Sequence, residues 1–505
     1  MLHLSKSKYC EIRQCPKIAW LKKYKPEASV LDEAALARMK DGNEVGDLAM
    51  GLFGDYVEVT AYDGETIDLP KMIERTAEEM RKGTPVICEA SFSFQGLYCA
   101  VDILRKENDG WAIYEVKSSS MHEGDKDIKG IYAADMAYQK YVLENCGVHV
   151  TGLYLVCLNS DYIFDGTLDL QKLFLITDAT DAVREEESYI EDNLAIAESI
   201  LSSSTEPEID LSENCRKPYS CSFWNYCSKH LPSPSVFDVA GMNFKTQIKY
   251  YKAGLTTYED LLSSTKIKND KQIRQMEYSL YHKGTYVDAP HIREFLHSLS
   301  YPLYFLDFET IQPVIPIFPG TRPYTQVPFQ YSLHYLESED AELQHKEFLA
   351  ESGTDPRRAL AEKLCYDIPM NVCIVAYNMS FESARISELA SLFPDLREHL
   401  LNMQANLKDL IVPFRSGYYY KREMEGSFSI KSVLPAMFPE DPELDYHSLD
   451  GVHNGAEAMT IFPKIQYMAP EEKEIARQNL LKYCKLDTYA MVKIWHALKD
   501  IADEA

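Results

Sequence analysis

The chain has 505 residues, of which 46% are hydrophobic and 26% charged, a composition typical of a folded protein with two to four domains. Its net charge of −26 argues against a surface that coats nucleic acid everywhere, but it allows a local basic channel. No apolar run reaches the length of a membrane span, and the start of the chain has no hydrophobic signal core. We therefore expect a soluble, cytoplasmic protein that needs no membrane, with its twelve cysteines present as reduced thiols or metal ligands.

Helices and strands are both predicted in the first third of the chain. Residues 1–50 are predicted to be helical, and their first half carries a basic cluster made up of Lys6, Lys8, Arg13, Lys17, Lys22, Lys23 and Lys25. Between about 56 and 160, the strand-like runs VICEASFSF, LYCAVDILR, WAIYEVKSS and HVTGLYLVCLN surround the helical run IYAADMAYQKYVLENCG. This is an α/β order. Residues 181–202 predict an acidic amphipathic helix.

Two acids and a lysine fall on neighbouring strands of this region. Asp102 lies on one strand, and Glu115 and Lys117 share a face of the next because side chains alternate along a strand. Such acids can bind Mg²⁺ while the lysine positions or activates water, although Glu-x-Lys is also a common ion pair. The pattern resembles the PD-(D/E)xK nuclease fold. The run DMAYQKYVL resembles the helix that carries the glutamine motif of its RecB-like members, with Gln139 as a substrate contact.

That resemblance implies a catalytic site formed by Asp102, Glu115 and Lys117, in which the two acids hold at least one Mg²⁺ or Mn²⁺ ion. RecB-like nucleases commonly carry a metal-binding histidine after Gly-x-x-Val, where this chain has Gly46. Its replacement is open among three acids: Glu44, Asp47 and Glu89.

Cysteines bracket the same region. Three of them form the C-x5-C-x5-C run CRKPYSCSFWNYC, and one lies some 200 residues earlier in CPKIAWL; they are Cys15, Cys215, Cys221 and Cys227. One early and three late cysteines around a nuclease core resemble the iron–sulfur RecB-like nucleases. The resemblance implies a [4Fe–4S] cluster that ties the ends of the domain together. Structural zinc is the alternative, because four thiolates also suit that ion.

The run HLPSPSVFD predicts a boundary between domains. We assign residues 1–231 to the first domain and 232–298 to a helical linker. Within that linker, YKAGLTTYEDLL has the character of a helix-hairpin-helix. A second α/β domain is expected over 299–505.

The second α/β domain opens with two carboxylates in the otherwise apolar strand YPLYFLDFET. Asp307 and Glu309 point to the same face because they are two residues apart. Buried acids are costly unless a cation neutralises them, so a lysine, an arginine or a metal is expected beside them. Further along, VCIVAYNMSFES places Glu382 just after a strand. LLKYCKLDTYAMVKIW places Tyr483 and Asp487 on one face of a helix.

This ordered set resembles the DEDD exonuclease family of the ribonuclease H-like fold. The resemblance implies two Mg²⁺ or Mn²⁺ ions held by four acids: Asp307, Glu309, Glu382 and Asp487. Tyr483 matches the residue that orients the attacking water in the tyrosine subclass. The family usually has aspartate where Glu382 stands, and a glutamate reaches further, which shifts the geometry. Three side chains are expected to touch the substrate: Asn378, Gln330 and Lys431.

Together these patterns predict a bacterial fusion of two nuclease modules, an iron–sulfur RecB-like one followed by a DEDD-type one. The expected activity is divalent-metal-dependent hydrolysis of DNA phosphodiesters, with a 3′–5′ exonuclease at the C-terminus acting on single-stranded or end-bearing DNA. The N-terminal module would cut as well or grip DNA. Two alternatives stay open: an RNA-processing exonuclease, and a non-catalytic nucleic-acid-binding or assembly protein whose acid sites have drifted.

Overall fold

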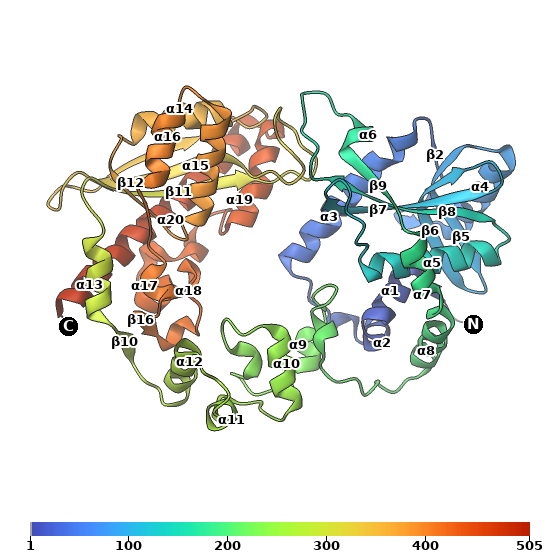
Figure 1. The fold of residues 1–505 in the computed structure, drawn as a ribbon, viewed down its shortest axis with the longest axis horizontal. Helices are drawn as coiled ribbons and strands as arrows, with labels where there is room; N and C mark the ends of the chain where they lie inside the picture. The colour runs from blue at the N-terminus through green and yellow to red at the C-terminus, as the bar shows by residue number, and fades with distance from the viewer. Residues whose placement is uncertain (1–2, 505) are drawn as a thin grey trace. The chain divides into compact units, whose positions relative to one another are not determined.

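The computed structural model describes residues 3–504, apart from the side chains of Glu33, Ala34 and His447. The chain divides into two compact units. Unit 1 consists of Met1–Leu231 with Val314–Thr325, and unit 2 consists of Pro232–Pro313 with Gln326–Ala505. Each unit contains helices and a central sheet, so the predicted α/β class is confirmed (Figure 1). No helix in the part of the chain that the structure describes is both long and apolar enough to cross a membrane.

A mixed seven-stranded sheet forms the centre of unit 1. Its strands follow the order β2-β5-β6-β7-β8-β9, and the short β1 pairs with β6 from outside that row. The pairs β5–β6, β6–β7 and β8–β9 are antiparallel, whereas β7–β8 is parallel. The strands are β1 (Leu4–Ser5), β2 (Val57–Glu58), β5 (Val86–Phe94), β6 (Leu97–Lys106), β7 (Trp111–Met121), β8 (Val150–Asn159) and β9 (Phe174–Asp178). A separate hairpin joins β3 (Tyr62–Asp63) to β4 (Thr66–Ile67).

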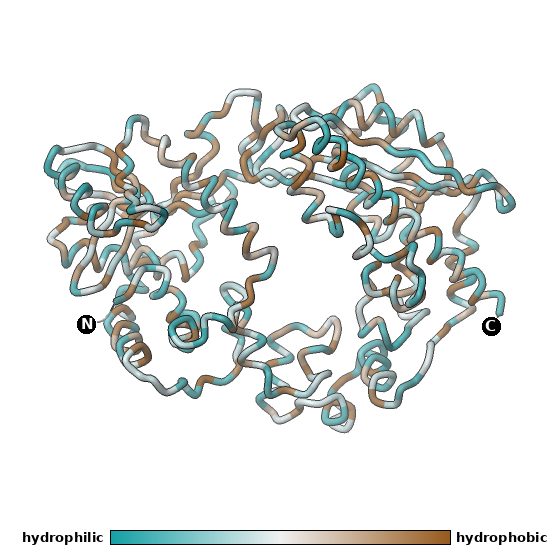
Figure 2. The backbone as a smooth tube through the Cα atoms, turned by 180° about the vertical axis from the view of Figure 1, so that it is seen from behind, coloured by the Kyte–Doolittle hydropathy of each residue, from teal (hydrophilic) through white to brown (hydrophobic). Residues whose placement is uncertain are grey.

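Hydrophobic and hydrophilic residues are interspersed along the backbone (Figure 2), and apolar residues of the strands form buried clusters with several helices of unit 1. A separate buried cluster contains Ile18, Trp20, Leu21 and Phe223. Nine α-helices are described in this unit. They are α1 (Lys6–Gln14), α2 (Pro16–Tyr24), α3 (Glu33–Ala49), α4 (Leu69–Lys82), α5 (Gly130–Asn145), α6 (Leu170–Leu173), α7 (Thr180–Glu187), α8 (Ile190–Ser202) and α9 (Trp224–Ser228). The single helix predicted over 181–202 is therefore wrong in one respect, because the chain breaks it into α7 and α8. At the break, Arg13 pairs with Glu186 at 2.8 Å and its guanidinium lies over the ring of Tyr189.

Unit 2 is built on a five-stranded sheet of order β13-β12-β11-β14-β15. The first three strands along the chain form an antiparallel meander, and β14 and β15 run parallel to β11. The central strand β11 contains the run that the sequence analysis singled out for its two acids. The strands are β11 (Leu303–Ile311), β12 (Val327–Leu336), β13 (Gln344–Leu349), β14 (Cys373–Ala376) and β15 (Leu407–Asp409).

Helices cover both faces of the unit 2 sheet (Figure 1). One face packs against α14 (Arg357–Asp367), α15 (Ser380–Leu392) and α16 (Arg397–Ala405) through buried aliphatic side chains. The other face packs against the 35-residue helix α20 (Pro470–Glu504). The smaller helices of this part are α17 (Val412–Arg415), α18 (Ile430–Met437) and α19 (Gly455–Ile461).

Residues 232–298, predicted to be a linker, belong to unit 2. They form α10 (Phe244–Lys252), α11 (Tyr258–Ser263), α12 (Asp270–Leu280), β10 (Thr285–Val287) and α13 (Ala289–His297). The strand β10 pairs with β16 (Tyr419–Lys421). Gln275 donates a hydrogen bond to the carbonyl oxygen of Glu425, which ties α12 to the sheet-bearing part of the unit, and another to that of Asp238 within the segment itself. The pairing of β10 with β16 and the hydrogen bonds of Gln275 explain why this segment is a fixed part of unit 2.

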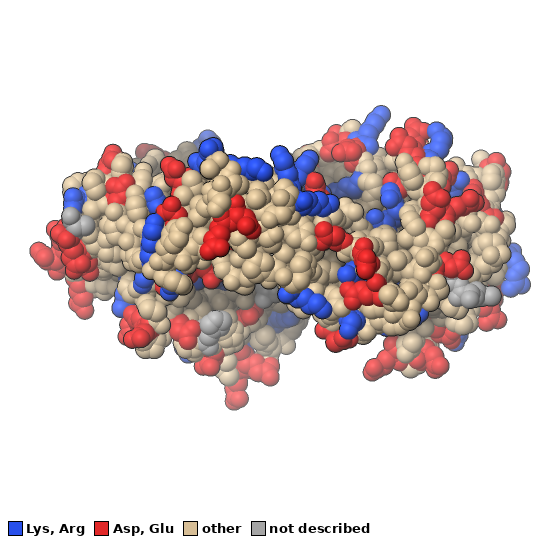
Figure 3. Space-filling view, turned by 90° about the horizontal axis from the view of Figure 1, so that it is seen from below, with Lys and Arg blue, Asp and Glu red and all other residues tan. Residues whose placement is uncertain are grey.

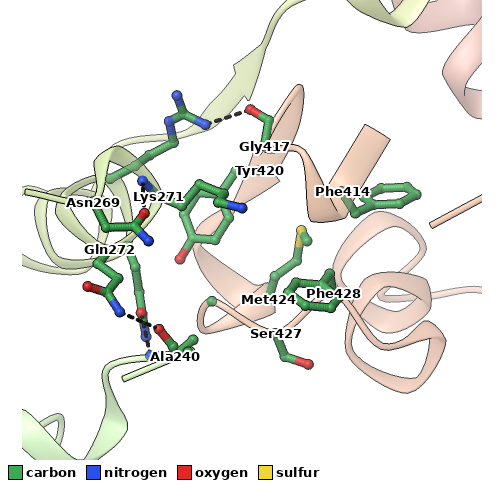
Figure 4. A pocket seen from close by; sticks show the side chains of 14 residues that line it. Ala240, Asn269, Lys271, Gln272, Phe414, Gly417, Tyr420, Met424, Ser427 and Phe428 are labelled. Carbon is green, nitrogen blue, oxygen red and sulfur yellow. Dashed lines mark hydrogen bonds between the residues drawn. The ribbon is translucent and has the colours of Figure 1, made fainter. Parts of the chain in front are cut away.

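A cavity of about 120 Å³ lies where α12 meets residues 414–428 (Figure 4). Its basic side chains are engaged by the backbone: Lys271 donates to the carbonyl oxygen of Arg415 at 2.8 Å, and Arg274 donates to that of Gly417 at 2.6 Å. The guanidinium of Arg274 also lies 3.5 Å from the ring centroid of Tyr286. These contacts make the cavity part of the docking of α12.

The connection between β11 and β12 belongs largely to unit 1, although both strands belong to unit 2. The part concerned is Val314–Thr325. Val314 and Ile315 are buried in an apolar cluster of that unit, and Tyr324 donates a hydrogen bond to the carbonyl oxygen of Ser118 at 2.8 Å. The burial of two aliphatic side chains gives this segment a place in unit 1 that the sequence pattern did not predict.

Candidate functional site

Two carboxylates on β11 begin a polar site in unit 2. Asp307 and Glu309 point to the same face of the central strand, as predicted, and α20 packs on that face. The Sγ atom of Cys484 lies 3.7 Å from Oδ2 of Asp307. One ligand atom from each of these three residues lies within 4.8 Å of the other two, a spacing that suits a bound metal ion.

Glu382 reaches this site from the first turn of α15. Asn378, four residues before Glu382, is exposed and has a φ of 66°. In this left-handed conformation the chain turns from β14 into the helix. Asp409 fixes that turn, since its Oδ1 accepts hydrogen bonds from the backbone N–H groups of Asn378 and Met379. The Glu382 side chain is only 2% exposed, and its Oε2 has no hydrogen-bond partner among the described residues.

Helix α20 supplies the remaining predicted groups. Tyr483 and Asp487 lie four residues apart on its inner side, where Tyr483 is 4% exposed. The hydroxyl of Tyr446 donates a hydrogen bond of 2.6 Å to Oδ1 of Asp487. Sequence reasoning missed Tyr446, which begins a short 3-10 helix (Tyr446–Ser448) where no spacing connects it to the other groups.

Burial raises the pKa values of all four predicted acids, and neighbouring acids of the set raise those of Asp307 and Glu309 further. Burial raises the pKa of Asp307 well above its usual range, and the charges of Asp487, Glu309 and Glu382 raise it further. Burial likewise raises the pKa of Glu309 well above its usual range, and the charge of Asp487 raises it further. The pKa of Glu382 rises to about 8 and that of Asp487 to about 6, in both cases mainly through burial. A cluster of acids this costly to ionise fits divalent cations, which would favour the charged forms.

A cavity of about 600 Å³ lies beside the acids. Lys431 and Tyr446 line it, together with His453, Asn454 and Glu457. The ammonium of Lys431 lowers the pKa values of Glu309 and Asp487, so it lies close enough to act on the carboxylates. The predicted role of Lys431 in binding substrate is compatible with this position.

Gln330 occupies a different environment from the one predicted. It pairs with Glu309 across β11 and β12, but its side chain is fully buried. Its Nε2 donates to the carbonyl oxygen of Leu480 at 2.8 Å, which anchors α20 to the sheet. A buried side chain cannot reach a substrate, so Gln330 supports the site from within the core.

In unit 1, the predicted acids and lysine also come together, with an extra cation. Lys117 Nζ lies 2.5 Å from Oε1 of Glu115 and 2.9 Å from Oδ2 of Asp135. Lys6 Nζ lies 3.1 Å from Oδ1 of Asp102 and 3.2 Å from Oε1 of Glu115. The ammonium of Lys6 therefore stands between the two acids expected to hold a divalent ion, and this arrangement does not fit a metal.

Gln139 is buried and donates to Oε2 of Glu115 at 2.7 Å and to Asp135 at 3.0 Å. It positions these acids and is out of reach of a substrate. Asp135 precedes Gln139 by four residues on α5, so the helical spacing could have revealed it. Sequence reasoning had no comparable signal for Lys6.

Among the candidates to replace the missing histidine, Glu89 is nearest to the acids. It lies at an irregularity of β5 with a φ of 57°. Burial raises its pKa to about 7, and the charge of Asp102 raises it further. The side chains of Glu44 and Asp47 are exposed, although the charge of Asp47 acts on Glu89.

All four predicted cysteines line one cavity of unit 1. Burial raises the pKa of Cys221 to about 11, and the charges of Cys215, Cys15 and Cys227 raise it further. Among the described residues, no three of these sulfur atoms lie within 4.8 Å of one another. The structure thus brings together, around one cavity, the four cysteines that the sequence analysis grouped.

The basic cluster near the start of the chain is largely neutralised inside unit 1. Lys6 pairs with the acid site, Arg13 with Glu186, Lys17 with Glu206 and Lys22 with Glu11. Acidic and basic side chains are interspersed on the face seen in Figure 3. Four of the seven basic side chains of the cluster are thus engaged in ion pairs, which argues against the local basic channel that the net charge allowed.

These features define an α/β protein with a metal-compatible acid cluster in one unit and a cysteine-lined cavity in the other. Residues 304–429 match a family described as a domain of unknown function (DUF2779). The match includes Asp307, Glu309 and Glu382 and ends before Tyr483 and Asp487.

Two curated relatives match part of the chain. "Uncharacterized protein UU173" of Ureaplasma parvum is 26% identical over 223 residues, which cover 40% of this chain and 32% of the relative. "Uncharacterized protein MG366 homolog" of Mycoplasma pneumoniae is 25% identical over 212 residues, or 39% of this chain and 32% of the relative. The chain thus matches about a third of the length of these relatives.

Proposed function

We propose that unit 2 is a divalent-metal-dependent 3′–5′ exonuclease of the DEDD type that hydrolyses DNA. The observation that carries the proposal is the convergence of four acids from three separate segments: Asp307, Glu309, Glu382 and Asp487. Their raised pKa values and the unpartnered Oε2 of Glu382 support a site that would bind further positive charge, such as a divalent ion.

The arrangement of the sheet supports this proposal. A five-stranded sheet with three antiparallel strands followed by two strands parallel to the first is the plan of the ribonuclease H-like fold. In that fold the central strand carries the first two acids, as β11 does here. The four acids would hold two Mg²⁺ or Mn²⁺ ions, which when bound activate water and stabilise the leaving oxygen.

The protein groups around the acids have distinct tasks in this proposal. Tyr483 is placed to orient the attacking water through its hydroxyl, and it stays protonated because burial and the neighbouring acids raise its pKa. Tyr446 holds the carboxylate of Asp487 through its 2.6 Å hydrogen bond. Lys431 faces the cavity of about 600 Å³, where its ammonium can contact a phosphate of the substrate.

We further propose that the four cysteines of unit 1 hold an iron–sulfur cluster, with zinc as the alternative. Thiolates are the usual ligands of such clusters, and the four cysteines line one cavity of unit 1, which supports this choice. In this proposal unit 1 is a PD-(D/E)xK-like module that binds nucleic acid, and the cluster ties residues near Cys15 to those near Cys227.

The function is tested by Mn²⁺-dependent digestion of single-stranded DNA labelled in turn at each end. Laddering from the 3′ end is expected for the wild type and for the control Asp340→Asn, which changes an exposed acid of unit 2. Asp307→Asn is expected to lose this activity by at least about 100-fold, because it removes a charged ligand. Undiminished laddering by Asp307→Asn would refute the assignment, and faster cleavage of a matched RNA would shift the substrate to RNA.

A further inference from the structure

Lys6 occupies an unusual position in the acid site of unit 1. Its ammonium is within 3.1–3.3 Å of one oxygen of Asp102 and both oxygens of Glu115. A Mg²⁺ ion bridging the same carboxylates would bind their oxygens at about 2.0–2.1 Å. The ion and the ammonium would then compete for one space, and their like charges would repel each other.

The backbone fixes Lys6 at this point. Residues Leu4–Ser5 form β1, which pairs in parallel with β6, the strand that carries Asp102. Leu4 is 2% exposed, and its carbonyl oxygen accepts a hydrogen bond of 2.6 Å from the hydroxyl of Tyr138. The backbone that leads into Lys6 is therefore anchored in the sheet, and the Lys6 side chain, 20% exposed, ends at the two carboxylates.

The carboxylates of Asp102 and Glu115 have further partners in this arrangement. Glu115 is fully buried and is contacted by Lys6, Lys117 and the amide of Gln139. The second oxygen of Asp102 accepts a hydrogen bond of 2.8 Å from the backbone N–H of Val116. With two ammonium groups beside the carboxylates of Asp102, Glu115 and Asp135, little negative charge is left for a divalent ion.

We propose that Lys6 is a built-in counter-ion that takes the place of a divalent metal between Asp102 and Glu115. Unit 1 then keeps a nuclease-like acid site without binding a divalent metal between these two carboxylates. This inference holds whether or not unit 2 proves to be an exonuclease, because it concerns only how unit 1 neutralises its acids.

The test counts bound Mn²⁺ by electron paramagnetic resonance in the full chain. The variants are Lys6→Met, its charge-preserving control Lys6→Arg, and the double variant Lys6→Met with Asp102→Asn. Compared with the wild type, Lys6→Met is expected to gain about one Mn²⁺ per chain, Lys6→Arg none, and the double variant is expected to lose the gain again. Because only differences are read, ions bound in unit 2 cancel.

Two results would overturn the proposal. The first is a folded Lys6→Met protein that binds no more Mn²⁺ than the wild type. The second result comes from a protein in which Lys6 is intact. If Asp102→Asn alone binds less Mn²⁺ than the wild type, a metal ion is held at Asp102, whereas the proposal expects the two proteins to bind equal amounts. The second measurement decides the matter even if Lys6→Met does not fold.

Discussion

Glu382 offers a direct test of the electrostatics of the unit 2 site. Its pKa rises to about 8 because the carboxyl is buried and faces the charge of Asp409. A carboxyl whose pKa is higher in the folded than in the unfolded state stabilises the protein while it is protonated, and that contribution is lost as the pH rises through the folded pKa. With about 1.4 kcal/mol for each unit of pKa, Glu382 alone should lower the free energy of unfolding by about 3 kcal/mol between about pH 5 and pH 8 when no divalent ion is present.

The substitution Glu382→Gln removes this ionisation while keeping the shape of the side chain. In EDTA at about pH 8, we expect the variant to be about 2–3 kcal/mol more stable than the wild type, and at about pH 5 the two should be similar. Saturating Mn²⁺ should reverse the order, because a ligand at about 100 times its dissociation constant adds about 2.7 kcal/mol to the protein that binds it.

Calorimetric unfolding measures this difference, with the transition of unit 2 identified as the one that Mn²⁺ shifts. Glu398→Gln is the matched control, since it changes an exposed glutamate on the neighbouring helix α16 and should follow the wild type at every pH. A wild-type stability that stays level or rises between about pH 5 and pH 8 in EDTA would refute the reasoning. So would a Glu382→Gln protein that is less stable than the wild type at about pH 8.

Three further predictions concern other parts of the molecule. Tyr446→Phe should lower kcat about 10-fold or more with little change in KM, because it removes a hydrogen bond to the charged Asp487; an unchanged rate would exclude a role for that hydroxyl. Cys215→Ser should remove a brown absorbance near about 400 nm from anaerobically purified protein, and a colourless wild type with stoichiometric zinc would contradict the cluster. Phe329→Ala should destabilise unit 2 by about 3–5 kcal/mol in urea unfolding, because Phe329 is fully buried and its ring stacks on that of Phe462 with the ring centroids 3.9 Å apart. A loss of stability below about 1 kcal/mol would contradict this packing.

The acid site of unit 2 was largely accessible from the sequence because each of its parts is a local pattern. Alternation along a strand puts Asp307 and Glu309 on one face, and the helical repeat puts Tyr483 and Asp487 on another. What the sequence did not reveal is that Tyr446 binds Asp487, or that Gln330 is buried, because both depend on how distant segments pack.

Unit 1 illustrates the same division more sharply. The sequence alone determined the strands, the pairing of Glu115 and Lys117 on one face, and the four cysteines as a set. Only the tertiary structure placed Lys6 between Asp102 and Glu115, which follow it in the chain by some 100 residues. Likewise, only the tertiary structure showed that Val314–Thr325 belongs to this unit. Periodicity fixes the direction of a side chain within its own element, whereas the partner that it meets is decided by which buried surfaces pack together, and no local pattern encodes that choice.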